Sequence, residues 1–173
     1  TTTKNLIPDK VYCWAGPALL PLETADSIPP VVKDAGTALD QLTVDFDAST
    51  DECRTVVFPI PAELDTTGSI TFTADWYSTA QSGAVVWDFR SNGGVAEGTD
   101  PDQTLTTFSA VADTTAGTAG QRNVTTWTIP FSVSGYVVGD LVDGEVCRDA
   151  NNGADSMAAD AKLKQFCVGV PRS

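Results

Sequence analysis

The stretch that decides the fold is VDGEVCRDANNGADSMAADAKLKQFCVGV, residues 142–170. Near its start, Val142 and Val146 alternate with polar residues, which is the period of a β-strand with one buried face. Near its end, Phe166 and Val168 alternate with other residues in the same way. We therefore expect two strands joined by a long acidic loop.

The second of these strands should be irregular. Leu163 falls on the wrong side of the alternation set by the later apolar residues, so we expect a β-bulge near Lys164 or Gln165. We expect this last strand of the chain to lie in the middle of a sheet. The fold would then depend on its final element.

Composition favours a single all-β domain with an N-terminal extension. The chain has 173 residues, is rich in Thr and contains no His. Its 10 basic and 23 acidic residues give a net charge of −13, which repels phosphate backbones and anionic lipid. We therefore expect no nucleic-acid partner and no membrane partner.

The termini carry no targeting pattern. No apolar run approaches the roughly 20 residues of a membrane span, and the N-terminus lacks the charged-then-apolar order of a secretory signal. We expect a soluble chain. Its first residue, Thr1, fits either removal of an initiator Met or processing of a precursor.

From Leu42 onward, short β-rich runs alternate with turn residues. The number and spacing of these runs predict an antiparallel jelly-roll β-sandwich of about eight strands over residues 41–173. The expected strands are 42–46, 54–60, 69–78, 84–90, 104–111, 123–131, 142–148 and 161–170.

Residues 1–40 are rich in proline and show no sustained periodicity, which predicts an extended N-terminal arm. The arm has too many apolar residues for a solvated linker, so we expect it to lie against its own domain or a neighbouring subunit. The candidate partner-binding residues are Trp14, Leu19, Leu20, Val31 and Val32.

A search for catalytic chemistry finds no constellation of base, nucleophile and metal. The usual base, histidine, is missing, and the paired carboxylates are explained by an acidic surface. We expect no enzyme activity, no catalytic or cofactor-binding residue, and no cofactor.

The acidic loop at residues 149–160 is the best candidate for a metal site. It offers Asp149, Asn151, Asp155 and Asp160 as oxygen ligands, but its glycine is misplaced for a calcium loop. A polar loop whose side chains cap their own backbone explains the same residues. We expect no metal site.

Trp76 and Trp87 lie on neighbouring expected strands, and packing in the core is the expected role of both. If they were exposed, they would instead form a platform on which sugars stack. This possibility keeps a carbohydrate-binding function open.

Several short motifs, taken in order from Leu42 to the C-terminus, carry a family resemblance. The motifs are Asp45-Phe46-Asp47, Thr50-Asp51-Glu52, Pro61, Trp76, Gly83 to Trp87, Arg148-Asp149-Ala150 and Asp160-Ala161. By these motifs, the chain resembles a β-sandwich domain that recurs in virion proteins of tailed bacteriophages, including capsid decoration, head-fibre and tail-fibre proteins. The four cysteines and the proline-rich arm depart from that pattern.

The resemblance implies a non-enzymatic structural protein of a virion. It implies first a decoration or cement protein on the outer surface of the capsid, bound to the major capsid protein as a homotrimer. A head- or tail-fibre appendage is the second expectation. A carbohydrate-binding β-sandwich module, from a different functional class, is the third, and a host glycan is a possible ligand.

Four cysteines allow three pairings, and their spacing does not suit zinc. In a jelly roll of eight strands, the second and seventh strands are antiparallel neighbours, and Cys53 and Cys147 both point outward there. We therefore expect a Cys53–Cys147 disulfide. Cys13 and Cys167 then form the second bond, which requires the arm to cross the final strand. Assembly in a reducing cytoplasm would leave all four as thiols.

Overall fold

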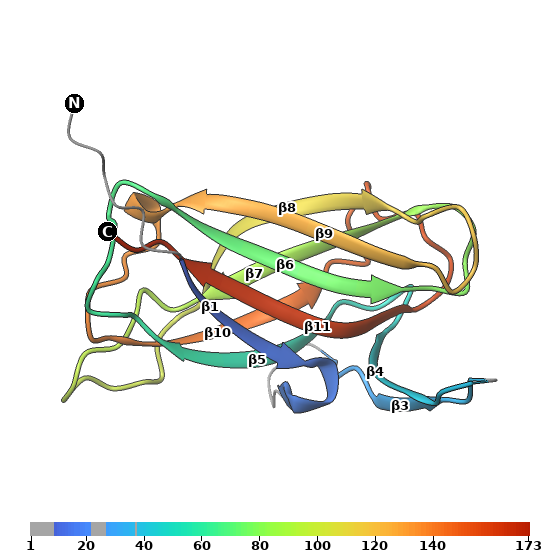
Figure 1. Cartoon of the computed structure of the whole chain (residues 1–173), viewed down its shortest axis with the longest axis horizontal. Coiled ribbons are helices and arrows are strands. Elements are labelled where there is room, and N and C mark those ends of the chain that lie inside the picture. The colour runs from blue at the N-terminus through green and yellow to red at the C-terminus, as the bar shows by residue number, and fades with distance from the viewer. Residues whose placement is uncertain (1–8, 22–26, 37) are drawn as a thin grey trace.

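The computed structural model describes residues 9–21, 27–36 and 38–173, which form two antiparallel β-sheets packed face to face (Figure 1). Two 3-10 helices, η1 (Gly16–Ala18) and η2 (Phe131–Val133), interrupt the strands. In this described part of the chain, no helix is long and apolar enough to cross a membrane. The strands are β1 (Lys10–Ala15), β2 (Leu20–Pro21), β3 (Val31–Asp34), β4 (Gln41–Phe46), β5 (Glu52–Pro59), β6 (Ser69–Tyr77), β7 (Ala84–Ser91), β8 (Thr106–Thr114), β9 (Arg122–Pro130), β10 (Leu141–Arg148) and β11 (Ala161–Val170).

The topology confirms the predicted jelly-roll sandwich. One sheet has the order β3-β4-β11-β6-β9, with β1 also paired to β11, and the other has the order β2-β5-β10-β7-β8. All eight expected strands are present as β4 to β11. The expected pairing of the second strand with the seventh is that of β5 with β10. In the other sheet, β4 pairs with β11.

Strand β11 occupies the middle of its sheet. One edge pairs with β6, while the other edge is shared, because β4 covers Ala161 to Leu163 and β1 covers the rest of the strand from Gln165. The register against β6 shifts between Leu163 and Gln165, which confirms the predicted bulge.

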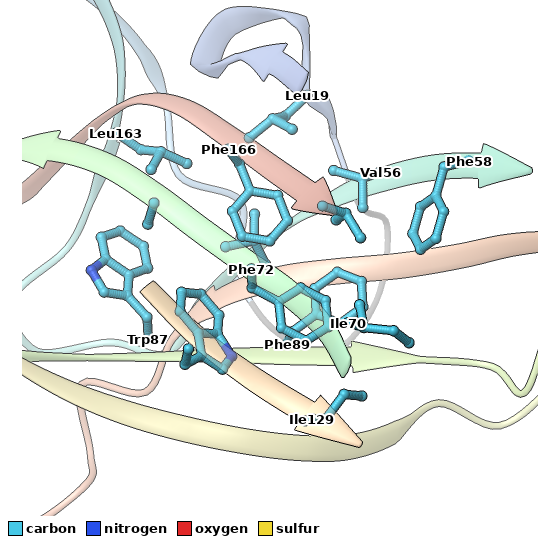
Figure 2. Packing of buried hydrophobic residues seen from close by; sticks show 14 of the residues in the cluster. Leu19, Val56, Phe58, Ile70, Phe72, Trp87, Phe89, Ile129, Leu163 and Phe166 are labelled. Carbon is cyan, nitrogen blue, oxygen red and sulfur yellow. The ribbon is translucent and has the colours of Figure 1, made fainter. Parts of the chain in front are cut away.

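The core lies between the sheets and is strongly aromatic (Figure 2). Alternate residues of β6, including Phe72, point inward and are fully buried, as the period of a strand requires. Phe72 stacks on Phe89 of the facing sheet with ring centroids 4.4 Å apart, and Phe166 of β11 lies against both. The contacts of Phe89 with Phe72 and Phe166 join the two sheets.

The structure contains the two disulfides expected from the sequence. Cys53 is bonded to Cys147 between β5 and β10, where the two residues are direct partners in the register. Cys13 of β1 is bonded to Cys167 of β11, again as direct partners. Each bond closes a long stretch of chain and contributes about 2–4 kcal/mol to stability.

The segment expected to form an extended N-terminal arm, residues 1–40, is described apart from 1–8, 22–26 and 37, which lie outside the described residues. Its described parts supply β1 and β3 to one sheet and β2 to the other. The physical reason is the open edge of β11, which β4 leaves after three residue pairs and β1 then completes.

Close packing of η1 on β11 confirms that this segment belongs to the domain. A Cβ atom added to Gly16 would lie 2.3 Å from the carbonyl oxygen of Leu163, so only glycine allows the two backbones to approach this closely. The preceding strand, β1, is fixed to the same strand by its disulfide.

The five candidate partner-binding residues divide into two groups. Leu19 is 2% exposed within the core, and the ring of Trp14 lies 6.2 Å from that of Phe58, so both pack against their own domain. By contrast, Leu20 and Val31 are exposed, and Val32 is half-buried.

Leu19 and Leu20 provide a matched test of this packing. Replacing Leu19 with Ala should lower the free energy of unfolding by about 2–4 kcal/mol, because it removes buried apolar area and leaves a cavity. The same change at Leu20, which is 54% exposed, should alter it by less than about 0.5 kcal/mol. Urea denaturation of both variants measures the difference, and equal losses would contradict the docking of this segment.

Candidate ligand-binding site

A hollow with a volume of about 830 Å³ lies on the outer face of the β3-β4-β11-β6-β9 sheet. We call it the outer hollow. Its volume falls in the range of small-molecule sites, about 300–1,000 Å³. It is lined by Ala15, Asp34, Ala35, Gly36, Gln41, Asp75, Tyr77, Thr79, Gly120, Arg122, Lys164 and Gln165.

The bulge in β11 forms part of the floor of the outer hollow. Leu163 and Phe166 are both buried in the core, so the two residues between them, Lys164 and Gln165, fall on the opposite side of the strand. A regular strand would present only one residue between two inward-facing ones. The irregularity therefore places two adjacent polar side chains in the outer hollow.

A hydrogen-bonded network centred on Asp34 forms one side of the outer hollow. Its carboxylate accepts a 2.7 Å hydrogen bond from the Tyr77 hydroxyl and a 3.1 Å bond from Lys162 Nζ, which also donates to Asp45. Burial would raise the pKa of Asp34, but these two hydrogen bonds outweigh it and hold the pKa below its usual value. Asp34 is therefore ionised at neutral pH.

Tyr77 keeps its proton over the physiological range. Burial, followed by the hydrogen bond and charge of Asp34, raises the pKa of Tyr77 to about 12. The phenol is thus a neutral donor, and its half-buried ring lines the hollow.

The opposite side of the outer hollow carries a second ion pair. Arg122 Nε lies 2.8 and 2.9 Å from the two carboxylate oxygens of Asp75, and Nη2 also donates to Asp75. On the floor, Lys164 donates to the side-chain oxygen of Gln41. The lining therefore contains two carboxylates and two cations, a balanced set in a chain of net charge −13.

The two tryptophans lie in the core, which confirms the role expected from the sequence and excludes them from a sugar-stacking platform. Trp76 and Trp87 are both fully buried, with ring centroids 6.2 Å apart. The sequence alone did not indicate the outer hollow, although Asp75 and Tyr77 lie on the outward face of β6. The alternation of residues along β6 was the available signal, but it does not reveal which residues of distant strands lie beside them.

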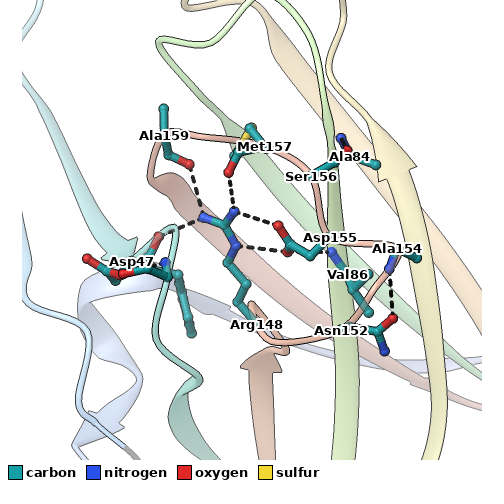
Figure 3. A network of polar contacts seen from close by, with 12 residues as sticks. Asp47, Ala84, Val86, Arg148, Asn152, Ala154, Asp155, Ser156, Met157 and Ala159 are labelled. Atoms are coloured by element: carbon teal, nitrogen blue, oxygen red, sulfur yellow. Dashed lines mark hydrogen bonds and ion pairs between the residues drawn. The ribbon is translucent and has the colours of Figure 1, made fainter.

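The acidic loop after β10 is organised around Arg148 (Figure 3). This fully buried guanidinium contacts both carboxylate oxygens of Asp155 at 3.0 and 2.8 Å. It also donates to the carbonyl oxygens of Phe46, Met157 and Ala159. The guanidinium of Arg148 is thus surrounded by oxygen atoms of the protein. These oxygens bind a cation that is part of the chain itself.

The other loop residues considered as metal ligands are engaged locally. Asp149 accepts a hydrogen bond from the side chain of Asn152, and the backbone of Asn151 donates to Asp51. The carboxylate of Asp155 also accepts from the backbone nitrogen of Val86. Within the loop, the backbone nitrogen of Ala154 donates to the side-chain oxygen of Asn152. The loop is thus held by its own side chains and by contacts to β7 and to Asp51.

A second buried polar cluster lies on the outer face of the other sheet, beside the Cys53–Cys147 disulfide. Asp88 is opposite Cys147 in the register, and one of its carboxylate oxygens lies 3.4 Å from Arg90 Nε. Its other oxygen is buried and has no hydrogen-bond partner among the described residues. Burial raises the pKa of Asp88 to about 6, although Arg90 opposes the shift.

Comparison with solved structures supports the fold. No protein-family model matches this sequence, and no curated protein matches it either. A family 35 carbohydrate-binding module from an environmental isolate is 11% identical, with a TM-score of 0.52 over 94% of this chain and 97% of its own. The CBM35 of Cellvibrio japonicus Abf62 is also 11% identical, with a TM-score of 0.50 over 92% of each chain. At this identity the similarity shows a shared β-sandwich fold and shows no link to phage virion proteins.

The buried carboxyl group of Asp88 predicts a pH dependence of stability. Its folded-state pKa is raised to about 6, so its favourable contribution is complete at low pH and is lost as the pH rises through 6. The Asp88→Asn variant should therefore be more stable than the parent by about 1–3 kcal/mol at pH 8 and similar to it near pH 4. Urea denaturation across this range measures the difference, with Asp102→Asn as the exposed control. A difference that does not vary with pH would contradict the assignment.

Proposed function

We propose that this chain is a non-catalytic carbohydrate-binding β-sandwich domain, and that the outer hollow binds its ligand. The observation that carries the proposal is a large hollow whose lining combines apolar surface with charged side chains of balanced sign. An uncharged ligand that has both hydroxyl groups and an apolar face, such as a sugar ring, suits such a lining.

The lining matches the chemistry of sugar hydroxyl groups, which donate and accept hydrogen bonds together. Carboxylates such as Asp34 accept, Arg122 donates, and the amides of Gln41 and Gln165 do both. The partly exposed ring of Tyr77 adds an amphipathic surface of the kind that packs against a polar ligand.

The similar solved structures support this proposal by their fold. Both are carbohydrate-binding modules, and this chain covers more than nine-tenths of each. We therefore propose that this domain, with its similar fold and a hollow on one sheet, binds the same class of ligand. The proposed role is binding alone.

A variant of the floor of the outer hollow tests the proposal. The protein should bind members of an array of uncharged oligosaccharides, and Gln165→Ala should weaken that binding about tenfold by removing hydrogen bonds to the ligand. Gln103→Ala, at an exposed position away from the outer hollow, is the matched control and should bind as the parent does. Isothermal titration calorimetry measures both affinities, and equal affinities for all three proteins would contradict the site.

A structural role in a virion is our second candidate function, and the projecting β3–β4 hairpin favours it (Figure 1). The hairpin carries three exposed apolar side chains, Val31, Leu39 and Leu42, at 47%, 70% and 56% exposure. Apolar groups gathered on a projection suit contact with another protein. We propose the major capsid protein as this partner, with the protein as a homotrimer on the outer surface of the capsid.

The hairpin can be tested separately from the outer hollow. Leu42→Asp should abolish attachment to tailed-phage particles that lack this protein, because it places a charge in an apolar contact. Val124→Asp, at an exposed apolar position on β9, is the control and should attach normally. Co-sedimentation measures attachment and light scattering measures the trimer. A monomer that also fails to attach would contradict this second candidate.

A further inference from the structure

We infer that the Cys53–Cys147 pair becomes a zinc-binding site when its disulfide is reduced, with Glu145 and Asp88 as the oxygen ligands. This inference is independent of the outer hollow and of the proposed function, because the four residues belong to the other sheet. Two thiolates and two carboxylates are a ligand set that suits a four-coordinate zinc ion.

Three neighbouring strands bring the four side chains together. Cys147 of β10 is the register partner of Cys53 on β5 and of Asp88 on β7. Glu145 lies two residues before Cys147, so it emerges on the same face of β10. Directly opposed β-positions have Cβ atoms about 4.5–5.5 Å apart. The spacing of the cysteines along the chain does not suit zinc, but strand pairing assembles a suitable set.

The ligand atoms lie close enough to share one ion. One ligand atom from each of Cys53, Cys147 and Glu145 lies within 4.8 Å of the other two. Cys147 Sγ is 3.9 Å from Glu145 Oε2. Zn–S and Zn–O bonds of about 2.3 and 2.1 Å place the ligand atoms of a tetrahedral ion about 3.3–3.8 Å apart. Side-chain rotations bring the three atoms to these separations once the bond between the sulfurs is broken.

Asp88 supplies the observation that points to a bound cation. It is 3% exposed, and its Oδ1 is buried without a hydrogen-bond partner in the described part of the chain. Such an atom is costly to bury. The other carboxylate oxygen is already engaged, 3.4 Å from Arg90 Nε. Because Asp88 is directly opposite Cys147, a cation bound to the Cys147 thiolate is within reach of this side chain.

Burial and charge favour zinc over bare thiolates. Cys53 and Cys147 are fully buried, and Glu145 is buried beside them. Buried anions are costly without a cation, and a thiol that coordinates zinc is deprotonated by it. Arg90 is opposite Glu145 in the register, where it offsets part of the negative charge of the ligands.

The disulfide and the zinc complex exclude each other, because only free thiolates bind the ion. A phosphine reductant breaks the bond between the sulfurs. The disulfide gains two electrons and two protons and becomes two thiols, while the phosphine takes the oxygen of water and becomes a phosphine oxide. Zn²⁺ then displaces one proton from each thiol and forms two Zn–S bonds. The site would thus be occupied in a reducing compartment and replaced by the disulfide in an oxidising one.

Metal titration of the reduced, intact protein tests the inference. After reduction with TCEP, a phosphine, the protein should bind one Co²⁺ per chain with a thiolate-to-cobalt charge-transfer band, and Zn²⁺ should displace it. The Cys53→Ser/Cys147→Ser variant should lose the band. Asp88→Asn should weaken Zn²⁺ binding by about tenfold or more, because loss of even an outer-shell partner of a zinc ligand costs about 10–100-fold. All proteins are compared in the reduced state, so no variant differs from another by a disulfide.

The other cysteine pair is the matched control. Cys13 is exposed, and the partner of Cys167 on β6 is Thr73, which is not a carboxylate. The Cys13→Ser/Cys167→Ser variant should therefore keep the full Co²⁺ band. Absence of the band in the parent protein, or its loss in this control alone, would overturn the inference. Unchanged Zn²⁺ affinity in the Asp88 variant would overturn the ligand set. Circular dichroism measures folding, and a reduced protein that stays unfolded in the presence of zinc would also overturn the inference.

Discussion

The pairing of β11 with three other strands is the constraint on which this structure depends. Strand β11 lies between β6 on one edge and β4 and β1 on the other. Because β4 covers only the first residues of that edge, β1 completes it, and the Cys13–Cys167 bond fixes the result. The bulge that β11 needs to keep Leu163 and Phe166 in the core also places Lys164 and Gln165 in the outer hollow. Core packing and the candidate site are therefore set by the same strand.

The loop that delivers the chain from β10 to β11 depends on a buried cation. Isolating the guanidinium of Arg148 from water is costly, and its bonds to Asp155 and three carbonyl oxygens offset that cost. One of those carbonyls belongs to Phe46 at the end of β4, so this residue joins the loop to the partner strand of β11. Removal of either charge would leave the other buried and unpaired.

The few basic residues of this acidic chain are unevenly distributed. Of the 10 basic residues, Arg122, Lys162 and Lys164 gather at or beside the outer hollow, where they compensate the carboxylates of Asp34 and Asp75. The rest of the surface keeps its negative charge. These cations therefore leave the sheet face at the outer hollow less negative than the molecule as a whole.

The sequence by itself predicted the strands from residue 42 onward, the pairing of the second strand with the seventh, the irregularity in β11 and the Cys53–Cys147 bond, which left Cys13 and Cys167 as the second pair. All of these follow from local alternation of residues and from the limited set of ways in which eight antiparallel strands close a sandwich. Only the tertiary structure decided that Leu19 lies in the core and that β1 fills the open edge of β11. It alone brought Asp34, Gln41, Asp75, Arg122 and Gln165 together. These residues come from five strands distant in sequence, and their proximity depends on pairing between strands, which alternation within one strand does not specify.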